Sequence, residues 1–192
     1  MESRTRSEVT THDPTQVLTE ARAQLAHLPR ALITLTAGLD DAAWRARPAP
    51  ERWAPVEIIC HLRDEEQDDF GARVRAVLEG RREFAPIDPE GWVEQRRYRD
   101  QDPRRALAEF EVRRAASLEL LARAAPERLR ESGASGTVRL SGLDLLAAWV
   151  AHDYLHLRQL AGTLARLWAT RWAPLRADYA GSLPYPCGEK SG

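Results

Sequence analysis

Three histidines, one alone and two as a pair, are the residues of this chain best suited to chemistry. His152 and His156 lie four positions apart, and His61 lies far upstream of them. On a helix, side chains four residues apart lie one above the other, with Cβ atoms about 5–6 Å apart. The pair can therefore grip one metal ion, and His61 on another helix would complete a face of three nitrogens.

Three protein ligands leave coordination positions for water or substrate, which is typical of a reactive site rather than a closed structural one. Imidazole binds zinc, nickel, copper and iron(II) comparably well, so the ligand type does not choose the metal. Each ligating ring is expected to donate its other N–H to a carboxylate or carbonyl group. Glu65, one helical turn beyond His61, is the first candidate for this acceptor, or alternatively for a general base. Asp64 and Asp153 are further options, although we expect the acidic run around Asp64 to be a solvated face.

A metal site has to be weighed against an ordinary reading of these residues. A lone histidine is usually a surface or satisfied core residue, and a single His-x-x-x-His pair often occurs without metal. Here the pair lies on an otherwise apolar helical stripe, where two imidazoles would need partners. The chain has five histidines, and three of them fall in these two segments. We therefore predict a metal site at His61, His152 and His156, which requires nitrogens within about 8 Å of one another.

The composition argues against several classes of protein. The 192 residues suit one domain, 43% of them are hydrophobic and 30% are charged, and the net charge is −1. A general nucleic-acid or membrane-surface binder would carry a basic excess. The many arginines are explained more simply by codon composition than by phosphate recognition. We expect a small-molecule substrate as the partner, with no nucleic acid and no membrane.

The two cysteines, Cys60 and Cys187, set no disulfide framework and are compatible with a reducing cytosol. The N-terminus lacks the apolar core of a secretory signal, and no stretch approaches the ~20 apolar residues of a membrane span. We therefore expect a cytoplasmic protein. Cys60 is expected to point about 100° away from His61 around their helix. It is interpreted as a small buried residue rather than as a ligand.

Capping signals and apolar periodicity predict four long helices. Asp-Pro pairs and a serine precede three of them, as expected for helix starts. Two connections should be irregular, and a turn with a short extended piece should precede the last helix. The expected helices cover 14–38 with a kink or break at Pro29, 55–80, 103–124 and 142–169, and a short helix is expected within the connection 81–101.

Four long helices with almost no strand signal predict an all-α fold, a four-helix bundle with a long crossover connection between helices 2 and 3. The domain is expected to span residues 13–172, between a flexible N-terminus over 1–12 and an irregular C-terminal tail over 173–192. The last helix is apolar on two stripes, so its histidine pair should face protein rather than bulk water.

Two stretches of the sequence resemble a known family. The first is Arg-Trp-Ala-Pro-Val-Glu-Ile-Ile-Cys-His-Leu-Arg-Asp-Glu-Glu at 52–66, followed by Phe70 and Arg73. The second is Trp-Val-Ala-His-Asp-Tyr-Leu-His-Leu-Arg-Gln at 149–159. Together they are similar to motifs of the DinB-like superfamily of DinB/YfiT-type metalloenzymes. One departure is Ala54, where that family usually has Ser or Thr. The alanine weakens the helix cap by about 1 kcal/mol and leaves the histidines untouched.

The resemblance implies more than the residues alone. It implies a four-helix bundle with a long crossover and a metal triad drawn from the second and last helices, here His61, His152 and His156. Nickel or zinc is the implied metal, with water in the open positions, and a homodimer is the implied assembly. Some relatives transfer bacillithiol or isomerise with mycothiol, others are called metal-dependent hydrolases, and many have no known activity. Fold therefore does not fix function here.

Three functions stay open at this point. The first is a metal-dependent enzyme, either a bacillithiol-type thiol S-transferase or a hydrolase of a small substrate, with Glu65 orienting a ligand or accepting a proton. The resemblance slightly favours thiol transfer. The second is a non-catalytic, stress-related metal-binding protein, and the third is a metal-free helical interaction module. Because ligating histidines must be neutral, a bound metal should be lost as the pH falls well below ~6.5.

Overall fold

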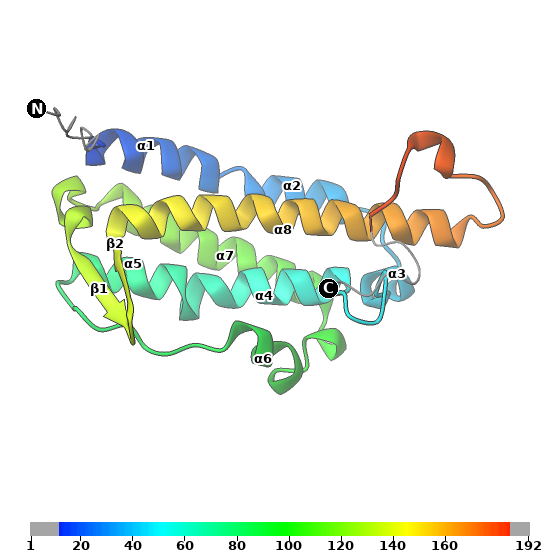
Figure 1. Ribbon diagram of the computed structural model, residues 1–192, viewed down its shortest axis with the longest axis horizontal. Helices are drawn as coiled ribbons and strands as arrows, with labels where there is room; N and C mark the ends of the chain where they lie inside the picture. The colour runs from blue at the N-terminus through cyan, green and yellow to red at the C-terminus, as the bar shows by residue number, and fades with distance from the viewer. Residues whose placement is uncertain (1–11, 185–192) are drawn as a thin grey trace, which may run out of the picture.

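The computed structural model describes residues 12–184, and it is an elongated bundle of four helical rows (Figure 1). The expectations for residues 1–11 and for Cys187 lie outside the described residues. The predicted all-α four-helix bundle is confirmed. The first row is α1 (Pro14–Leu25) and α2 (Leu28–Thr36), the second is α4 (Pro55–Asp68) and α5 (Phe70–Leu78), the third is α7 (Pro103–Ala122), and the fourth is α8 (Gly142–Arg171).

Short elements occupy the connections between the rows. A brief helix lies in the connector before α4, and an antiparallel strand pair leads into α8. These elements are α3 (Asp41–Arg45), α6 (Pro89–Gln95), β1 (Ser132–Ser135), β2 (Val138–Ser141), and the 3-10 turns Tyr98–Asp100, Pro126–Arg130 and Asp178–Ala180. The expected single extended piece before the last helix is thus the second strand of a hairpin, and α3 was not anticipated in the connector.

The rows begin where the capping signals place them. The Asp13 side chain accepts a hydrogen bond from the backbone N–H of Thr15 at 3.0 Å at the start of α1, and Asp102 opens α7 in the same manner. At the start of α4, Ala54 offers no capping side chain. Glu57 compensates in part, since its carboxylate accepts the Ala54 N–H at 2.7 Å. The helix therefore keeps one half of the capping arrangement.

Two rows are interrupted, one as expected and one against expectation. The break near Pro29 occurs just before it, so that the proline lies in the first turn of α2, where its missing N–H costs no helical hydrogen bond. The predicted continuous helix over 55–80 is wrong, because the chain breaks at Asp69 with φ −124° and ψ −97°. A Cβ atom on Gly71 would lie 1.9 Å from the carbonyl oxygen of Glu66, so this close approach requires glycine.

The order of the rows explains the long crossover connection. α4 and α5 run in the same direction along the bundle as α7, whereas α1, α2 and α8 run in the opposite direction (Figure 1). The segment between α5 and α7 must therefore return along the whole bundle, and it does so outside the rows through α6. α4 packs along α7, and α1 packs along α8.

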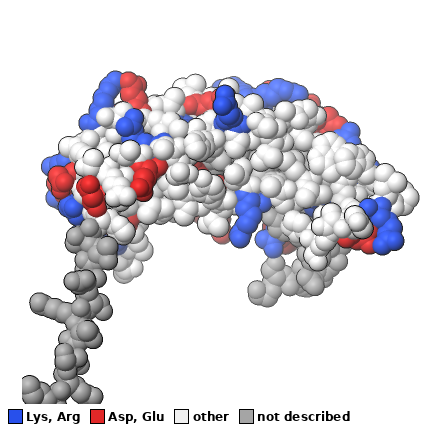
Figure 2. Space-filling model, turned by 90° about the horizontal axis from the view of Figure 1, so that it is seen from above, with Lys and Arg blue, Asp and Glu red and all other residues white. Residues whose placement is uncertain are grey.

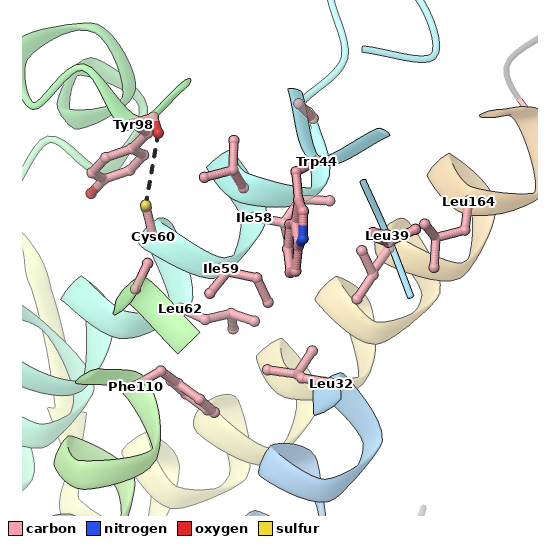
Figure 3. Packing of buried hydrophobic residues seen from close by; sticks show 14 of the residues in the cluster. Leu32, Leu39, Trp44, Ile58, Ile59, Cys60, Leu62, Tyr98, Phe110 and Leu164 are labelled. Atoms are coloured by element: carbon pink, nitrogen blue, oxygen red, sulfur yellow. Dashed lines mark hydrogen bonds between the residues drawn. The ribbon is translucent and has the colours of Figure 1, made fainter. Parts of the chain in front are cut away.

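The core consists of two apolar clusters with polar side chains between them. One cluster surrounds Ile58, Leu62 and Phe110 (Figure 3), and the other contains Leu25 and Leu146. Buried and half-buried polar residues lie where the rows pass from one cluster to the other, in the C-terminal part of α4 and in the middle of α7 and α8. We call this set the polar layer: His61, Glu65, Glu66, Arg114, Ser117, His152, Asp153 and His156.

Charged side chains on the face drawn in Figure 2 are mixed in sign and lie mostly towards its edges, with uncharged atoms across the middle. This distribution agrees with the nearly balanced formal charge of −1. Within residues 12–184, no helix combines the length and the apolar character that crossing a membrane would demand.

Candidate metal centre

The three predicted ligands come together in the polar layer. The Nε2 atom of His152 lies 3.2 Å from Nε2 of His61 and 3.0 Å from Nε2 of His156. One ligand atom from each of the three rings lies within 4.8 Å of the others. Two nitrogens bound tetrahedrally to one zinc ion at about 2.0–2.1 Å are about 3.3–3.4 Å apart. The spacing of the nitrogens thus fits a shared metal ion.

The helical rows place these rings from two directions. His61 projects from α4, while His152 and His156 project from one face of α8, one turn apart. Trp53, just before α4, packs its indole 4.9 Å from the His61 ring and stacks at 6.0 Å on His156. Phe70 lies 5.0 Å from the ring of His152. The break at Asp69 therefore matters for the site, because it starts a new helix with an aromatic side chain against the histidines.

Burial keeps the three imidazoles neutral. It lowers the pKa of His61 to about 2, and the charges that the other two rings would carry act in the same direction. Burial likewise lowers the pKa of His152 to about 3, with further contributions from His156 and Arg114. The pKa of His156 is also lowered by burial. Neutral imidazole is the form that binds metal, so the electrostatics prepare the rings for coordination.

The second ring nitrogens show a mixture of satisfied and unsatisfied atoms. Nδ1 of His156 lies 2.7 Å from the amide oxygen of Gln159. Nδ1 of His61, Nδ1 of His152 and Oε1 of Glu65 are buried without a hydrogen-bond partner among the described residues. Three Nε2 atoms facing one another also cannot all be satisfied by neutral rings, which carry one N–H each. A cation between the Nε2 atoms would satisfy them together, so the residues present fit a metal.

Glu65 stands where the sequence analysis placed it, beside His61. Its Oε1 lies 3.8 Å from Nδ1 of His61, slightly beyond hydrogen-bond distance. Burial, together with the neighbouring carboxylate of Asp69, raises the pKa of Glu65 to about 9. Arg73 forms an ion pair with Asp69 and completes this side of the site. The role of Glu65 as an acceptor or a base stays a prediction that this placement is consistent with.

The solvated acidic face expected around Asp64 is wrong for that residue. The Asp64 side chain is buried and accepts hydrogen bonds at 2.7 Å from both Arg63 and Arg96 and at 2.9 Å from the Tyr98 hydroxyl. Although burial acts in the opposite direction, hydrogen bonds led by that from Arg63 lower the pKa of Asp64. Asp64 is therefore an arginine partner on the side of α4 that faces α6 and α7, and not an acceptor for a ligating histidine.

Asp153, the other alternative acceptor, belongs to a buried ion-pair group. Arg114 donates to both oxygens of Asp153, at 2.6 and 3.0 Å, and its Nε donates to Glu66 at 2.8 Å. Burial raises the pKa of Asp153 to about 6. We call Glu66, Arg114 and Asp153 the arginine group, and the three histidines with Glu65 the histidine group.

Sequence reasoning missed the arginine group, although one signal was present. Phe110, Arg114, Ser117 and Leu121 recur at steps of four, three and four, so all four share the core face of α7. An arginine on such a face implies buried carboxylate partners. An explanation of the arginines as a class by codon composition overlooks this buried position.

Cys60 lies away from the histidines, as its helical position indicates. It is fully buried in one apolar cluster, with Sγ 3.9 Å from the carbonyl oxygen of Tyr98 (Figure 3). Burial raises the pKa of the Cys60 thiol to about 12. A thiol so protonated is a poor nucleophile and a poor ligand.

Comparisons with known proteins place this geometry in a family. The fold is similar to that of YfiT from Bacillus subtilis, described as a probable metal-dependent hydrolase with an unusual four-helix bundle topology. The two share 16% identity over 87% of this chain and 94% of that chain, with a TM-score of 0.70.

A second similar structure is the mycothiol-dependent maleylpyruvate isomerase, with 16% identity and a TM-score of 0.59. The match covers 78% of this chain but only 61% of the isomerase, so part of that protein has no counterpart here. No curated protein matches the sequence. At this identity both likenesses concern the fold.

A family model settles the relationship at the level of sequence. The model of the DinB superfamily matches residues 24–160, which include all three histidines and the whole polar layer. The chain belongs to the DinB superfamily.

Proposed function

We propose that this protein binds one divalent metal ion through His61, His152 and His156 and uses it to act on a small-molecule substrate. The convergence of the three Nε2 atoms, at 3.0 and 3.2 Å, carries the proposal. Nickel and zinc are the metals we favour, since imidazole ligands suit both and the family resemblance points to them. Three neutral ligands leave the full charge of the ion in place, so that a bound ion would supply a Lewis acid that lowers the pKa of water or of a thiol.

The residues around the ligands have definable tasks in such a site. Trp53 and Phe70 cover the imidazole rings with apolar surface, which limits water at the ligands and strengthens local electrostatic interactions. In the absence of a bound cation, the raised pKa of Glu65 keeps its carboxyl group protonated at neutral pH. A cation bound at the histidines would lower that pKa, and the Glu65 carboxylate could then accept a proton from the attacking group.

Among reactions, we favour transfer of a low-molecular-weight thiol of the bacillithiol type over hydrolysis. In the transfer, the sulfur forms a bond to an electrophilic carbon, a halide or epoxide oxygen leaves with the bonding electrons, and the thiol proton goes to Glu65 or solvent. Support is divided, because one protein of similar fold is a mycothiol-dependent isomerase and another is described as a probable hydrolase. Hydrolysis of a small ester or amide is therefore the second candidate.

The experiment has two stages. Purified protein is analysed for bound metal, then loaded with Ni²⁺ or Zn²⁺ and assayed with bacillithiol-type thiols against chlorinated and epoxide electrophiles, and with small esters and amides. We expect near one equivalent of metal and thiol consumption that His152→Ala abolishes. Cys60→Ser serves as a matched control, since its Sγ belongs to an apolar cluster, and it should keep the activity.

The outcomes separate the alternatives. Turnover of esters without thiol consumption would replace transfer by hydrolysis. Tight, slowly exchanging metal without turnover would favour a non-catalytic metal-binding protein. Protein that takes up no metal would leave a helical interaction module as the reading. The homodimer implied by the resemblance stays a prediction, and light scattering of the purified protein tests it.

A further inference from the structure

The arginine group is saturated with hydrogen bonds. Arg114 is only 1% exposed. Its Nε and Nη2 reach Oε1 of Glu66 at 2.8 and 2.5 Å. Its Nη1 and Nη2 reach the two oxygens of Asp153 at 2.6 and 3.0 Å, and Nη1 also donates to the carbonyl oxygen of Leu25 at 2.8 Å. The planar guanidinium thus has each of its nitrogens committed to a direction.

These bonds join all four rows of the bundle at one level. Arg114 itself comes from α7, Glu66 from α4, Asp153 from α8, and the Leu25 carbonyl from the end of α1. Helix ends leave carbonyl groups without intrahelical partners, and the interruption between α1 and α2 supplies one here. The side chain of Arg114 therefore links the two helices that carry the histidines, α4 and α8, through a third helix, α7.

The fastened residues are neighbours of the metal ligands in sequence. Asp153 follows His152 directly on α8, and Glu66 lies five residues after His61 on α4. A rotation of α8 about its axis that moved the His pair away from His61 would also pull Asp153 from Arg114. The histidine group and the arginine group therefore both depend on the same relative placement of α4 and α8.

A second connection runs through aromatic rings. The indole Nε1 of Trp149 donates to Oε1 of Glu66 at 3.2 Å. The ring of Phe70 stacks on Trp149 at 5.8 Å and lies 5.0 Å from His152. Glu66 thus positions the Trp149 indole, and Trp149 in turn packs against Phe70, which contacts His152.

Stability alone is a poor reason for such a group. Burying ions costs desolvation energy, and well-packed apolar residues of similar volume usually stabilise a core at least as well. Apolar contacts, however, tolerate small rotations and shifts of one helix against another, whereas a bidentate guanidinium–carboxylate pair does not. Ligands for one metal must be held within about 0.5 Å of the productive geometry. The geometric precision of the arginine group matches that demand.

We propose that Arg114 is a positioning residue of the metal centre: through Asp153 and Glu66 it fixes the rotation and register of α8 against α4, so that His152 and His156 meet His61. This inference rests on the proposed metal site and deepens it. Arg114 is not a ligand and does not touch the substrate. Its effect is on where the imidazole nitrogens stand.

The test removes the charges together, so that no buried ion is left unpaired. The variant Glu66→Gln/Arg114→Met/Asp153→Asn keeps approximate shape and amide hydrogen bonding. Full-length parent and variant are stripped of metal, titrated with Ni²⁺ against a competing chelator, and loaded with Co²⁺ for absorption spectroscopy. We expect the variant to keep its helical circular dichroism, to bind Ni²⁺ about 10–100-fold more weakly, as for loss of an outer partner, and to show altered Co²⁺ bands.

Two further variants distinguish positioning from stability. Leu121→Ala opens the apolar cluster farther along α7, and it should lower the unfolding temperature while keeping the parent's Ni²⁺ affinity and Co²⁺ spectrum. Arg114→Lys keeps the charge but not the planar fork, so it should weaken Ni²⁺ binding.

Parent-like Ni²⁺ affinity and Co²⁺ bands in the folded triple variant would overturn the inference, as would parent-like binding in Arg114→Lys. A loss of affinity in Leu121→Ala equal to that of the triple variant would reduce the effect to stability and overturn it too. If the parent itself binds no metal, the proposed function falls together with this inference. If the parent binds metal and the variants bind it equally well, only the positioning role is excluded and the proposed metal site stands.

Discussion

The histidine group and the arginine group lie in the same layer of the bundle and differ in how far their polar atoms are satisfied. Both draw residues from α4 and α8, and the arginine group adds Arg114 from α7. In the arginine group, each nitrogen of Arg114 has an acceptor. In the histidine group, Nδ1 of His61, Nδ1 of His152 and Oε1 of Glu65 are buried without a partner among residues 12–184. The three unpaired atoms are themselves buried, so exposure to water does not explain the difference.

The contrast separates a frame from a binding site. Buried polar groups in folded proteins are almost always hydrogen-bonded, and exceptions call for a reason. The arginine group follows the rule and fixes the helices. The histidine group departs from it, and the departure is accounted for if the imidazoles and Glu65 are arranged for an ion that the protein acquires.

The largest expected effect breaks the histidine group. His152→Ala removes the central nitrogen, the one close to both others, and should reduce Ni²⁺ or Zn²⁺ affinity by more than about 100-fold, beyond the range seen for outer partners. Equilibrium dialysis with elemental analysis measures the loss. His27→Ala is the matched control, because His27 is exposed and lies between α1 and α2. Equal metal content in both variants would contradict the assignment.

The next effect breaks the arginine group by one residue. Arg114→Met leaves Glu66 and Asp153 buried without their cation, which should lower the free energy of unfolding by about 3–5 kcal/mol. Urea denaturation at neutral pH measures it. Arg105→Met is the comparison, since Arg105 pairs with Glu109 at the surface and should cost about 0–1 kcal/mol. Similar losses in the two variants would mean that the buried group has no special weight.

Glu65→Gln sharpens the comparison within the histidine group. If Glu65 accepts the His61 N–H once metal is bound, the variant should bind Ni²⁺ about 10–100-fold more weakly. Without metal, the stability of the variant should fall less than that of the parent as the pH rises into the alkaline range. The pKa of Glu65 is raised to about 9, so its stabilising contribution is present below about pH 4.5 and is lost as pH rises towards 9. Glutamine has no such loss, and urea titrations at pH 6 and 9 compare the two proteins.

The acid side tests the neutral histidines. Because burial lowers the pKa of His61 to about 2 and of His152 to about 3, the unfolded chain takes up protons before the folded one below pH 6.5. Stability of the metal-free protein should therefore fall as pH decreases from 6.5 towards 3. Metal release should follow in this window rather than at 6.5 itself. A stability that is flat between pH 6.5 and 4 would contradict the assigned burial of the rings.

The smallest expected effect concerns Cys60. Its pKa of about 12 leaves almost no thiolate at pH 8. In a Cys187→Ser background, we expect a thiol-specific disulfide reagent to leave the folded protein unmodified and to label one equivalent after denaturation. Rapid labelling of the native protein would show that this cluster opens, and would return Cys60 to consideration as a reactive residue.

The sequence sufficed for what short-range spacing and periodicity decide. The spacing of His152 and His156, the Asp-Pro helix starts, and the apolar stripes gave the four rows and the face on which the pair lies. His61 was found as a third histidine on another predicted helix, and the family motifs supported its place beside the pair. These features depend on residues within one or two helical turns of each other, where the geometry of a helix is fixed.

What escaped prediction depends on contacts between distant segments. The break at Asp69 follows from the close approach of Gly71 to the Glu66 carbonyl, which no local propensity reveals. Asp64 is buried because Arg96 and Tyr98 come from the crossover connection to meet it. Arg114 stood on an apolar face, but its partners lay on other helices.

The division of the apolar core has one more consequence. The interruptions at Ala26-His27 and at Asp69 both fall at the level of the polar layer. Two of the four rows therefore lose their helical continuity at the level where the apolar core is also interrupted. The bundle thus consists of two apolar clusters that meet at the polar layer. An ion bound by His61, His152 and His156 would cross-link α4, which ends at this level, to α8, which passes through it without a break.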